Sequence, residues 1–161
     1  MPQGRSPIQF LLEESRDDQN PDAEVLHQLL AELRLVAVVG LSRDPSKAAR
    51  RVPSYLAAKG IDVIPVNPNA ARVLGREAQP SLDDVQEEVD LVLVFRPSEE
   101  AGAVVRQAAR RPEAPAIWLQ EGIMAPEAVR AARKEGLTVV QDLCIFKAHR
   151  LVSGGAGAPP G

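Results

Sequence analysis

The stretch that decides the fold is LVAVVGLSRDPSKAARRVPSYLAAKGIDVIPVNP, residues 35–68. It begins with a short apolar run, 35–39, that ends at Gly40, and it closes with a second apolar run over 61–67. Between these runs, the composition of residues 45–60 is typical of a helix. A buried strand, a helix and a second buried strand form the unit from which parallel sheets are built.

The same alternation of apolar runs and helical segments continues to residue 140. Further strands are predicted over 90–95, 116–120 and 137–140, and helices over 81–86, 98–111 and 125–136. A helix before the first strand is predicted to begin at Asn20, which is a good cap, with Pro21 in its first turn. Pro53 predicts a kink or a late start of its helix, and Pro65 removes one hydrogen-bond donor from its strand. Together these elements predict an α/β fold, a three-layer αβα architecture with a mainly parallel five-stranded sheet.

The composition excludes several classes of protein. The 161 residues include 19 Lys and Arg against 22 Asp and Glu, which gives a net charge of −3. One Cys excludes an intramolecular disulfide, and with only two His it leaves little for a structural zinc site. The mild acidity, with three Phe, one Trp and one Tyr, argues against a nucleic-acid-binding protein. No apolar run reaches the length of about 18 residues that a membrane span needs, and no secretory signal is present. We therefore expect a cytoplasmic protein with neither a nucleic-acid nor a membrane partner, in which Cys144 is a free thiol.

The two ends of the chain differ in composition from its middle. Residues 1–20 are predicted to be a flexible N-terminal segment, and the acidic stretch over 13–24 is interpreted as a solvated linker and helix start. Whether the first twenty residues dock on the domain is left open. The tail SGGAGAPPG, 153–161, is predicted to be flexible, so the predicted domain spans residues 21–152.

The loop after the first strand is the first candidate binding segment, because ligands bind parallel sheets at the carboxyl ends of the strands. Gly40 occupies the first position of the dinucleotide fingerprint, whereas Ser42 and Pro45 replace its other glycines. The second strand ends in PVNP and lacks the acidic residue that usually binds the ribose of NAD. The fingerprint is therefore degenerate, and a plain strand-ending turn is the alternative.

Basic side chains gather in this loop although the chain as a whole is acidic. Arg43, Lys47, Arg50 and Arg51 against Asp44 give a local charge of about +3. Lys47 and Arg51 are four residues apart and lie on one face of the predicted helix. A basic cluster at the start of a helix suits a ligand with several phosphates, whereas an ordinary solvated surface is the alternative.

The loops after the other strands complete the candidate site. Asn67, between two prolines, supplies a donor and an acceptor, and Phe95 suits an adenine or a pantetheine arm. The segment QEG, 120–122, adds an amide and a flexible Gly after the fourth strand. For each of these loops the alternative is a strand-ending turn or core packing.

No established catalytic motif occurs in the sequence, which lacks both G-x-S-x-G and H-E-x-x-H. Asp142, Cys144 and His149 are the remaining candidates. The alternative for Asp142 is a turn or cap role, and for Cys144 it is a small core residue. His149 could pair with Cys144 only if the fold brings the two into contact. The sequence therefore favours binding over catalysis, and whether the chain is an enzyme stays uncertain.

The runs VVGLSRDPSK, YLAAKGIDVIPVNP, VDLVLVFRP, IWLQEGI and GLTVVQDLC, in this order, resemble the small stand-alone CoA-binding proteins. Those proteins are similar to the N-terminal CoA-binding domain of the succinyl-CoA synthetase α-subunit. The resemblance covers about residues 25–150, and it departs from the family pattern at Ala49, Leu93 and Ala148. It implies a Rossmann-like fold that holds coenzyme A at the strand ends. The residues that it implies for ligand binding are Gly40, Leu41, Ser42, Lys47, Arg51, Val52, Val66, Asn67, Pro68, Phe95, Arg96, Gln120, Gly122 and Ile123.

The expected function is binding of coenzyme A or an acyl-CoA without catalysis by this chain itself. One alternative is an NADP-type oxidoreductase or a CoA-dependent transferase that uses Asp142, Cys144 or His149. The other is a nucleotide-sensing interaction protein that reports its ligand state to a protein partner.

Overall fold

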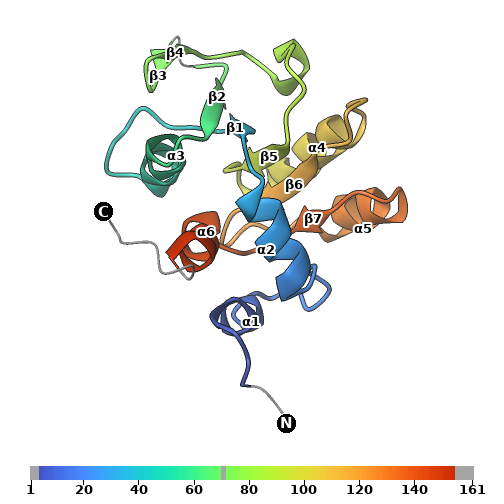
Figure 1. The fold of residues 1–161 in the computed structure, drawn as a ribbon. Helices are drawn as coiled ribbons and strands as arrows, with labels where there is room; N and C mark the ends of the chain where they lie inside the picture. Colours follow the sequence, from blue (N-terminus) through green and yellow to red (C-terminus); the bar gives the residue numbers. More distant parts are fainter. Residues whose placement is uncertain (1–3, 70–71, 155–161) are drawn as a thin grey trace.

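The computed structural model describes residues 4–69 and 72–154 (Figure 1). Its helices are α1 (Pro7–Glu13), α2 (Ala23–Ala31), α3 (Ala48–Ala58), the 3-10 helix η1 (Leu82–Asp84), α4 (Ser98–Ala109), α5 (Pro126–Lys134) and α6 (Ile145–Gly154). Its strands are β1 (Leu35–Val39), β2 (Asp62–Val66), β3 (Arg72–Val73), β4 (Arg76–Glu77), β5 (Leu91–Val94), β6 (Ala116–Leu119) and β7 (Val139–Val140). The main sheet is parallel with the order β2-β1-β5-β6-β7, which confirms the predicted Rossmann-like α/β fold.

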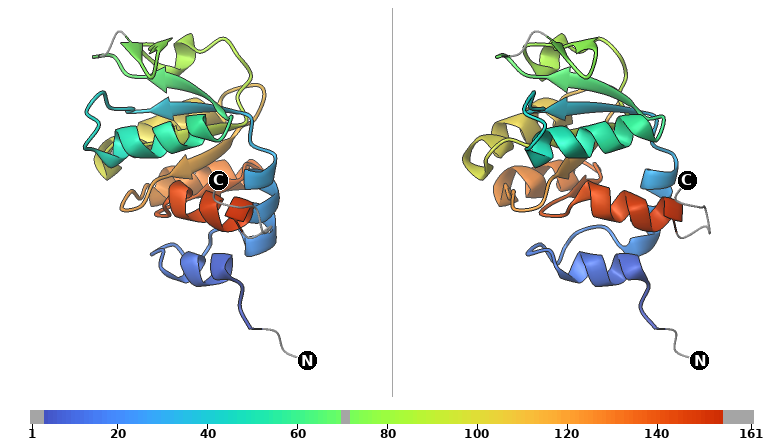
Figure 2. Two further views of the ribbon diagram at one scale, coloured as in Figure 1. Left: turned by 60° about the vertical axis from the view of Figure 1, so that its left-hand side comes forward. Right: turned by 90° about the vertical axis from the view of Figure 1, so that its left-hand side faces the viewer.

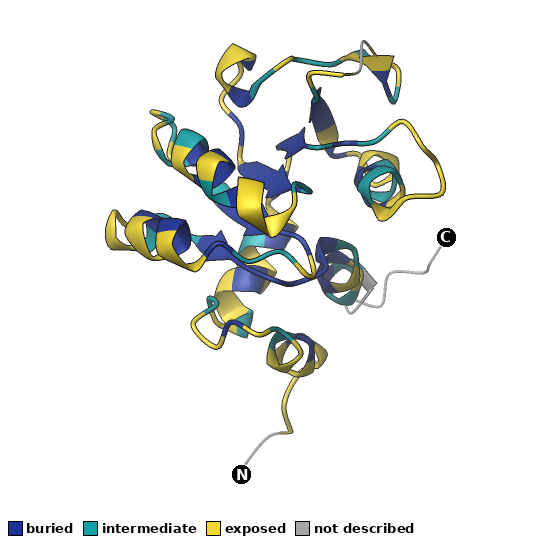
Figure 3. Cartoon of the chain, turned by 180° about the vertical axis from the view of Figure 1, so that it is seen from behind, coloured by how far each residue is buried: buried dark blue, intermediate teal, exposed yellow. Residues whose placement is uncertain are grey.

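Helices cover both faces of this sheet and so form the three predicted layers (Figures 1 and 2). Successive strand residues alternate between two apolar clusters: Val36 and Val38 of β1 face α2, α3 and α6, whereas Ala37 and Val39 face α4 and α5. The strands are buried on both sides (Figure 3). This explains why they appear in the sequence as continuous apolar runs.

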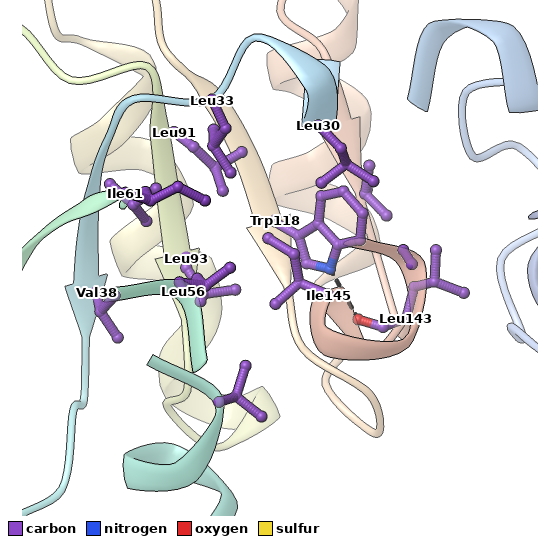
Figure 4. Packing of buried hydrophobic residues seen from close by; sticks show 14 of the residues in the cluster. Leu30, Leu33, Val38, Leu56, Ile61, Leu91, Leu93, Trp118, Leu143 and Ile145 are labelled. Atoms are coloured by element: carbon purple, nitrogen blue, oxygen red, sulfur yellow. Dashed lines mark hydrogen bonds between the residues drawn. The ribbon is translucent and has the colours of Figure 1, made fainter. Parts of the chain in front are cut away.

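Trp118 of β6 lies in the centre of the first cluster and is fully buried. Its indole N–H donates to the carbonyl oxygen of Leu143 at 2.8 Å (Figure 4). The ring therefore supplies apolar contact area while its polar atom is satisfied, as a buried Trp requires. Trp118 is therefore a core residue.

The two prolines within predicted elements are accommodated in different ways. Helix α3 starts at Ala48 instead of residue 45, and Pro53 lies inside it. Pro53 has no N–H to donate to the carbonyl of Ala49, and this carbonyl instead accepts from the Ser42 N–H at 3.0 Å. Pro65 lies in β2 at the sheet edge, where its carbonyl accepts from the Gln79 N–H at 2.9 Å.

The N-terminal segment differs from the flexible segment predicted over residues 1–20. Residues 7–13 form helix α1, which packs on α6 and α2 and buries Ile8 and Leu11. Ser6 caps this helix with a capping box that includes Gln9. The sequence shows no obvious amphipathic period over only seven residues, so tertiary packing decides this helix.

The acidic stretch over 13–24 is also more than a solvated linker. Asp17 is buried and pairs with Arg133 at 2.9 Å. Helix α2 is capped by Asp22 instead of Asn20, because the Asn20 side chain binds both main-chain groups of Gln141. Asn20 thereby covers the outer edge of β7, which no further strand of the main sheet covers.

The remaining differences concern short elements and the C-terminal part of the chain. The two-stranded β3-β4 ribbon and helix α6 were not predicted, and the predicted helix over 81–86 is the short 3-10 helix η1. Residues 153 and 154 of the predicted flexible tail belong to α6, and residues 155–161 lie outside the described residues. Across residues 4–69 and 72–154, no helix combines the length and the apolar character needed to cross a membrane.

Candidate functional site

The strand order reverses between β1 and β5. The chain leaves β1 towards β2 on one side, and β5, β6 and β7 follow on the other side. The loops after β1 and β5 therefore part at the carboxyl edge of the sheet, where open α/β sheets bind their ligands. Figure 2 shows the long loop after β1 at this edge.

Gly40 brings these two loops into direct contact. Its φ of +94° is strained for any residue with a Cβ, and a Cβ would lie 3.1 Å from Cδ of Arg96 and 3.2 Å from the carbonyl carbon of Phe95. Its N–H donates to the carbonyl of Val66 at 2.9 Å. One glycine thus holds together the ends of β1, β2 and β5.

Asn67 joins the loop after β2 to the loop after β1. Its Nδ2 donates to the carbonyl of Leu41 at 2.9 Å, and its Oδ1 accepts from the Asn69 N–H at 2.8 Å. The donor of the side-chain amide therefore joins the ends of β1 and β2, and its acceptor closes the turn after β2. Pro68, next in the chain, is exposed beside this junction.

The loop between β1 and α3 is closed by its own short polar side chains. Ser42 Oγ accepts from the Asp44 N–H at 3.0 Å, and Asp44 Oδ1 accepts from the N–H and the hydroxyl of Ser46 at 3.0 and 2.8 Å. These bonds from Ser46 hold the pKa of the Asp44 carboxyl below its ordinary value. The loop is therefore held by hydrogen bonds within itself.

The start of α3 is left open to an anion. Lys47 is its N-cap and gives no side-chain capping bond, so the N–H groups of Ala48 and Ala49 have no backbone acceptor within the described chain. Free amides at a helix start favour negative charge. The two residues of the predicted pair, Lys47 and Arg51, differ in their contacts. The Lys47 side chain is exposed, whereas the Arg51 guanidinium donates to the carbonyl of Ser46.

The basic side chains around this helix start carry net positive charge. Within residues 4–69 and 72–154, no ion pair involves Arg43, Lys47, Arg50 or Arg51. Arg50 Nε is buried and has no hydrogen-bond partner there. An uncapped helix start, an orphaned guanidinium nitrogen and unpaired cations fit the phosphates of a nucleotide ligand.

The loop after β5 contributes an aromatic ring and a guanidinium. Phe95 is half-buried and packs against the first apolar cluster, so core packing accounts for part of its surface. Arg96 forms an ion pair with Glu100, its Nε lying 3.1 Å from the carboxylate. Both residues lie against Gly40 and hence beside the loop after β1.

The loop after β6 forms a second part of the edge. Gln120 is buried, and its Oε1 accepts from the N–H of Ile145 at the start of α6. Gly122 has a φ of +89° and donates its N–H to Asp142 at 2.6 Å, and the Ile123 N–H donates to the carbonyl of Gln120. A Cβ at Gly122 would meet no atom within 4 Å, so the space over this residue is open.

Three predicted site residues are placed in the core. Leu41 and Val52 are buried in the first apolar cluster, and Val66 is buried in the second. Their side chains pack beneath the edge, and the carbonyls of Leu41 and Val66 take part in the loop contacts.

The three candidate catalytic residues are engaged elsewhere. Asp142 accepts from the N–H and Nε of Arg16 and from Gly122, and these bonds outweigh burial and lower the pKa of its carboxyl. Cys144 is buried. His149 Nδ1 lies 2.8 Å from the hydroxyl of Tyr55. No group of three or more His, Cys, Asp or Glu is arranged to hold a metal ion within the described ranges.

Sequence reasoning missed the residues that support the loop after β6. Ala125 donates its N–H to Gln141 Oε1 at 2.7 Å, and Met124 donates its N–H to Ser98 Oγ at 3.0 Å. The only signal was the placement of Gln141 and Asp142 directly after the fifth predicted strand. Nothing in the sequence indicated that Arg16 and Asp17 contribute to this support. Arg16 is 126 positions from its partner Asp142, and Asp17 is 124 positions from its partner Gln141.

Known proteins resemble this chain over most of its length. The model of the CoA binding domain family matches residues 34–150. An uncharacterized protein of Bacillus subtilis, YneT, is 36% identical over 131 residues, which are 81% of this chain and 96% of that protein. The ADP-forming acetate–CoA ligase II of Archaeoglobus fulgidus is 30% identical over 89 residues, or 54% of this chain and 13% of the ligase.

A solved structure extends the likeness to three dimensions. A hypothetical protein from Pyrococcus horikoshii OT3 has a TM-score of 0.80 at 30% identity, over 87% of this chain and 98% of its own. Family match, relatives and strand order agree, and they bear out the resemblance stated from the sequence motifs. The chain belongs to the CoA binding domain family.

Proposed function

We propose that this chain binds coenzyme A or an acyl-CoA at the carboxyl edge of its sheet and has no catalytic activity of its own. The observation that carries the proposal is the uncapped start of α3 with its cations, at the strand-order reversal between β1 and β5. A coenzyme A molecule has a pyrophosphate and a separate 3′-phosphate, and such a ligand needs a helix start and additional cations together.

The two parts of the edge suit the two ends of such a ligand. The amides of Ala48 and Ala49, with the Arg50 guanidinium, would take the pyrophosphate. Lys47 and Arg51, four residues apart, would take the 3′-phosphate. The open space over Gly122 would take the pantetheine arm. Asn67 and Phe95, beside the first loop, would flank the nucleotide.

The absence of catalysis is proposed from the engagement of the candidate groups. The Asp142 carboxylate already accepts three hydrogen bonds, and the His149 ring is bound to Tyr55. A general base needs a free lone pair within reach of a substrate proton.

A thermal-shift series against CoA, acetyl-CoA, NAD, NADP and ATP tests this function. A ligand at about 100 times its Kd adds about 2.7 kcal/mol, which raises the Tm of a protein of this size by about 5–10 °C. We expect this shift with CoA or acetyl-CoA. A shift with NADP alone would contradict the proposal and favour the oxidoreductase alternative, and a shift with ATP alone would favour the sensor alternative.

Substitution of both Lys47 and Arg51 by Ala tests the phosphate site. We expect the Kd of CoA to rise about tenfold and that of dephospho-CoA to rise less, because one phosphate contact is missing from the latter. Lys59→Ala, at the opposite end of α3, removes a charge from the same helix and serves as the control. Equal losses for both ligands would contradict the assignment of this pair to the 3′-phosphate.

A further inference from the structure

The loop after β6, residues 120–125, is held by side chains that accept from its backbone. Gly122 donates its N–H to Asp142 Oδ1 at 2.6 Å, and Ala125 donates its N–H to Gln141 Oε1 at 2.7 Å. The two acceptors are neighbours in the chain, directly after β7. The position of this loop therefore depends on how these two side chains are oriented.

A second pair of neighbouring residues orients the first pair. The N–H and Nε of Arg16 donate to Asp142 Oδ2 at 2.7 and 3.1 Å. Asp17 Oδ2 accepts from Gln141 Nε2 at 2.9 Å. Two chains of hydrogen bonds thus connect the N-terminal segment with the loop. One runs from Arg16 through Asp142 to Gly122, and the other runs from Asp17 through Gln141 to Ala125.

Asp17 decides which way the Gln141 amide faces. An ionised carboxylate only accepts, so Gln141 must present its NH₂ group to Asp17 and its oxygen to the Ala125 N–H. Arg133 donates to the same Asp17 oxygen at 2.9 Å and keeps the carboxylate ionised. Asp17, Gln141 and Asp142 are all buried, so water cannot replace these partners at low cost.

We propose that Arg16, Asp17, Gln141 and Asp142 form a clamp that positions the loop 120–125 for the pantetheine arm of the ligand. This inference rests on the proposed function, because the loop matters for binding only if the ligand lies over Gly122. Arg16 and Asp17 lie outside residues 34–150, the part that matches the family model. Half of the proposed clamp therefore comes from the N-terminal segment, outside the part of the chain that matches the family model.

The test compares two ligands on two variants. Asp17→Asn keeps the shape of the side chain but allows the Gln141 amide to reverse, and Asp142→Asn removes one acceptor while tolerating the left-handed backbone at φ +56°. For both variants we expect the Kd of CoA to rise about tenfold. The Kd of adenosine 3′,5′-bisphosphate, which lacks the pantetheine arm, should change less than about twofold. Asp18→Asn is the matched control, because Asp18 is exposed and, within the part of the chain that the structure describes, its carboxylate accepts a hydrogen bond only from the side chain of Gln19.

Amide hydrogen exchange in the ligand-free protein gives a readout that does not depend on binding. We expect Asp17→Asn to speed exchange at Ala125 and Asp142→Asn to speed it at Gly122, with amides of β5 unchanged. Equal weakening of both ligands would show general destabilisation and overturn the proposal, as would unchanged exchange at both amides. If the wild type binds no CoA, the proposed function fails, whereas the exchange result still decides whether the clamp holds the loop.

Discussion

At the scale of single residues, Gly40 determines whether the two halves of the edge meet. Its left-handed backbone and the contacts that a Cβ would make with Phe95 and Arg96 are separate constraints, and both exclude other residues. Gly60 has a similar φ of +87°, but a Cβ there would meet no atom within 4 Å. The two glycines therefore separate backbone strain from close approach.

Gly40→Ala is expected to lower the free energy of unfolding by about 2–4 kcal/mol, and Gly60→Ala by about 1 kcal/mol. The first substitution should also weaken CoA binding, because the loops after β1 and β5 are pushed apart. Urea denaturation and calorimetric titration measure the two effects. Equal destabilisation by both substitutions would show that the close approach to Arg96 costs nothing.

At the scale of elements, α3 is bonded to the loop before it because Pro53 lacks a backbone N–H. Pro53 leaves the Ala49 carbonyl free, and the Ser42 N–H takes it at 3.0 Å. A proline that would ordinarily weaken a helix thus ties the candidate phosphate loop to the first turn of α3.

Pro53→Ala adds an N–H that competes with Ser42 for the Ala49 carbonyl. We expect the free energy of unfolding to change by less than about 1 kcal/mol while the Kd of CoA rises about threefold, because the loop loosens. Pro126→Ala is the control, since Pro126 is at the start of α5, where no helical hydrogen bond is missing. Titration calorimetry on both variants measures the difference, and unchanged CoA affinity in Pro53→Ala would remove the role of this bond.

At the scale of the whole molecule, α6 packs against α1, α2 and α3. His149 of α6 is buried against Tyr55 of α3, and burial, followed by the charge of Lys59, lowers the pKa of its imidazole. A lowered pKa of a base means that protonation is less favourable in the folded than in the unfolded state. The stability is complete above the unfolded pKa of about 6.5 and falls as the pH decreases through the folded pKa.

The free energy of unfolding is therefore expected to decrease between about pH 7 and about pH 5 in the wild type. His149→Gln should flatten this decrease, because the group that must be protonated is gone. His27→Gln should retain it, since the only other histidine is exposed. Denaturant titrations at several pH values measure the slope. An equal slope in the wild type and His149→Gln would contradict the burial argument.

The sequence alone predicted the elements that have a strong local signal. The five strands of the main sheet were predictable because their residues, apart from the exposed Asp62, are apolar and mostly buried. Gly, Pro and capping residues mark the intervening helices. Helix α1 is too short for a periodic signal, and in α6 the sequence pattern has no marked start. Both helices are stabilised by contacts with distant parts of the chain.

The sequence by itself determined the α/β class, the order of the strands along the chain and the loops that follow them. Hydrophobic periodicity and turn residues are local properties, and they need no knowledge of the folded state. Only the tertiary structure decided that Gly40 meets Arg96, that Ala49 binds Ser42 and that Asp17 orients Gln141. More than fifty positions separate Gly40 from Arg96 and Asp17 from Gln141. Each of these contacts depends on how the helices and strands pack, and no local sequence pattern contains that information.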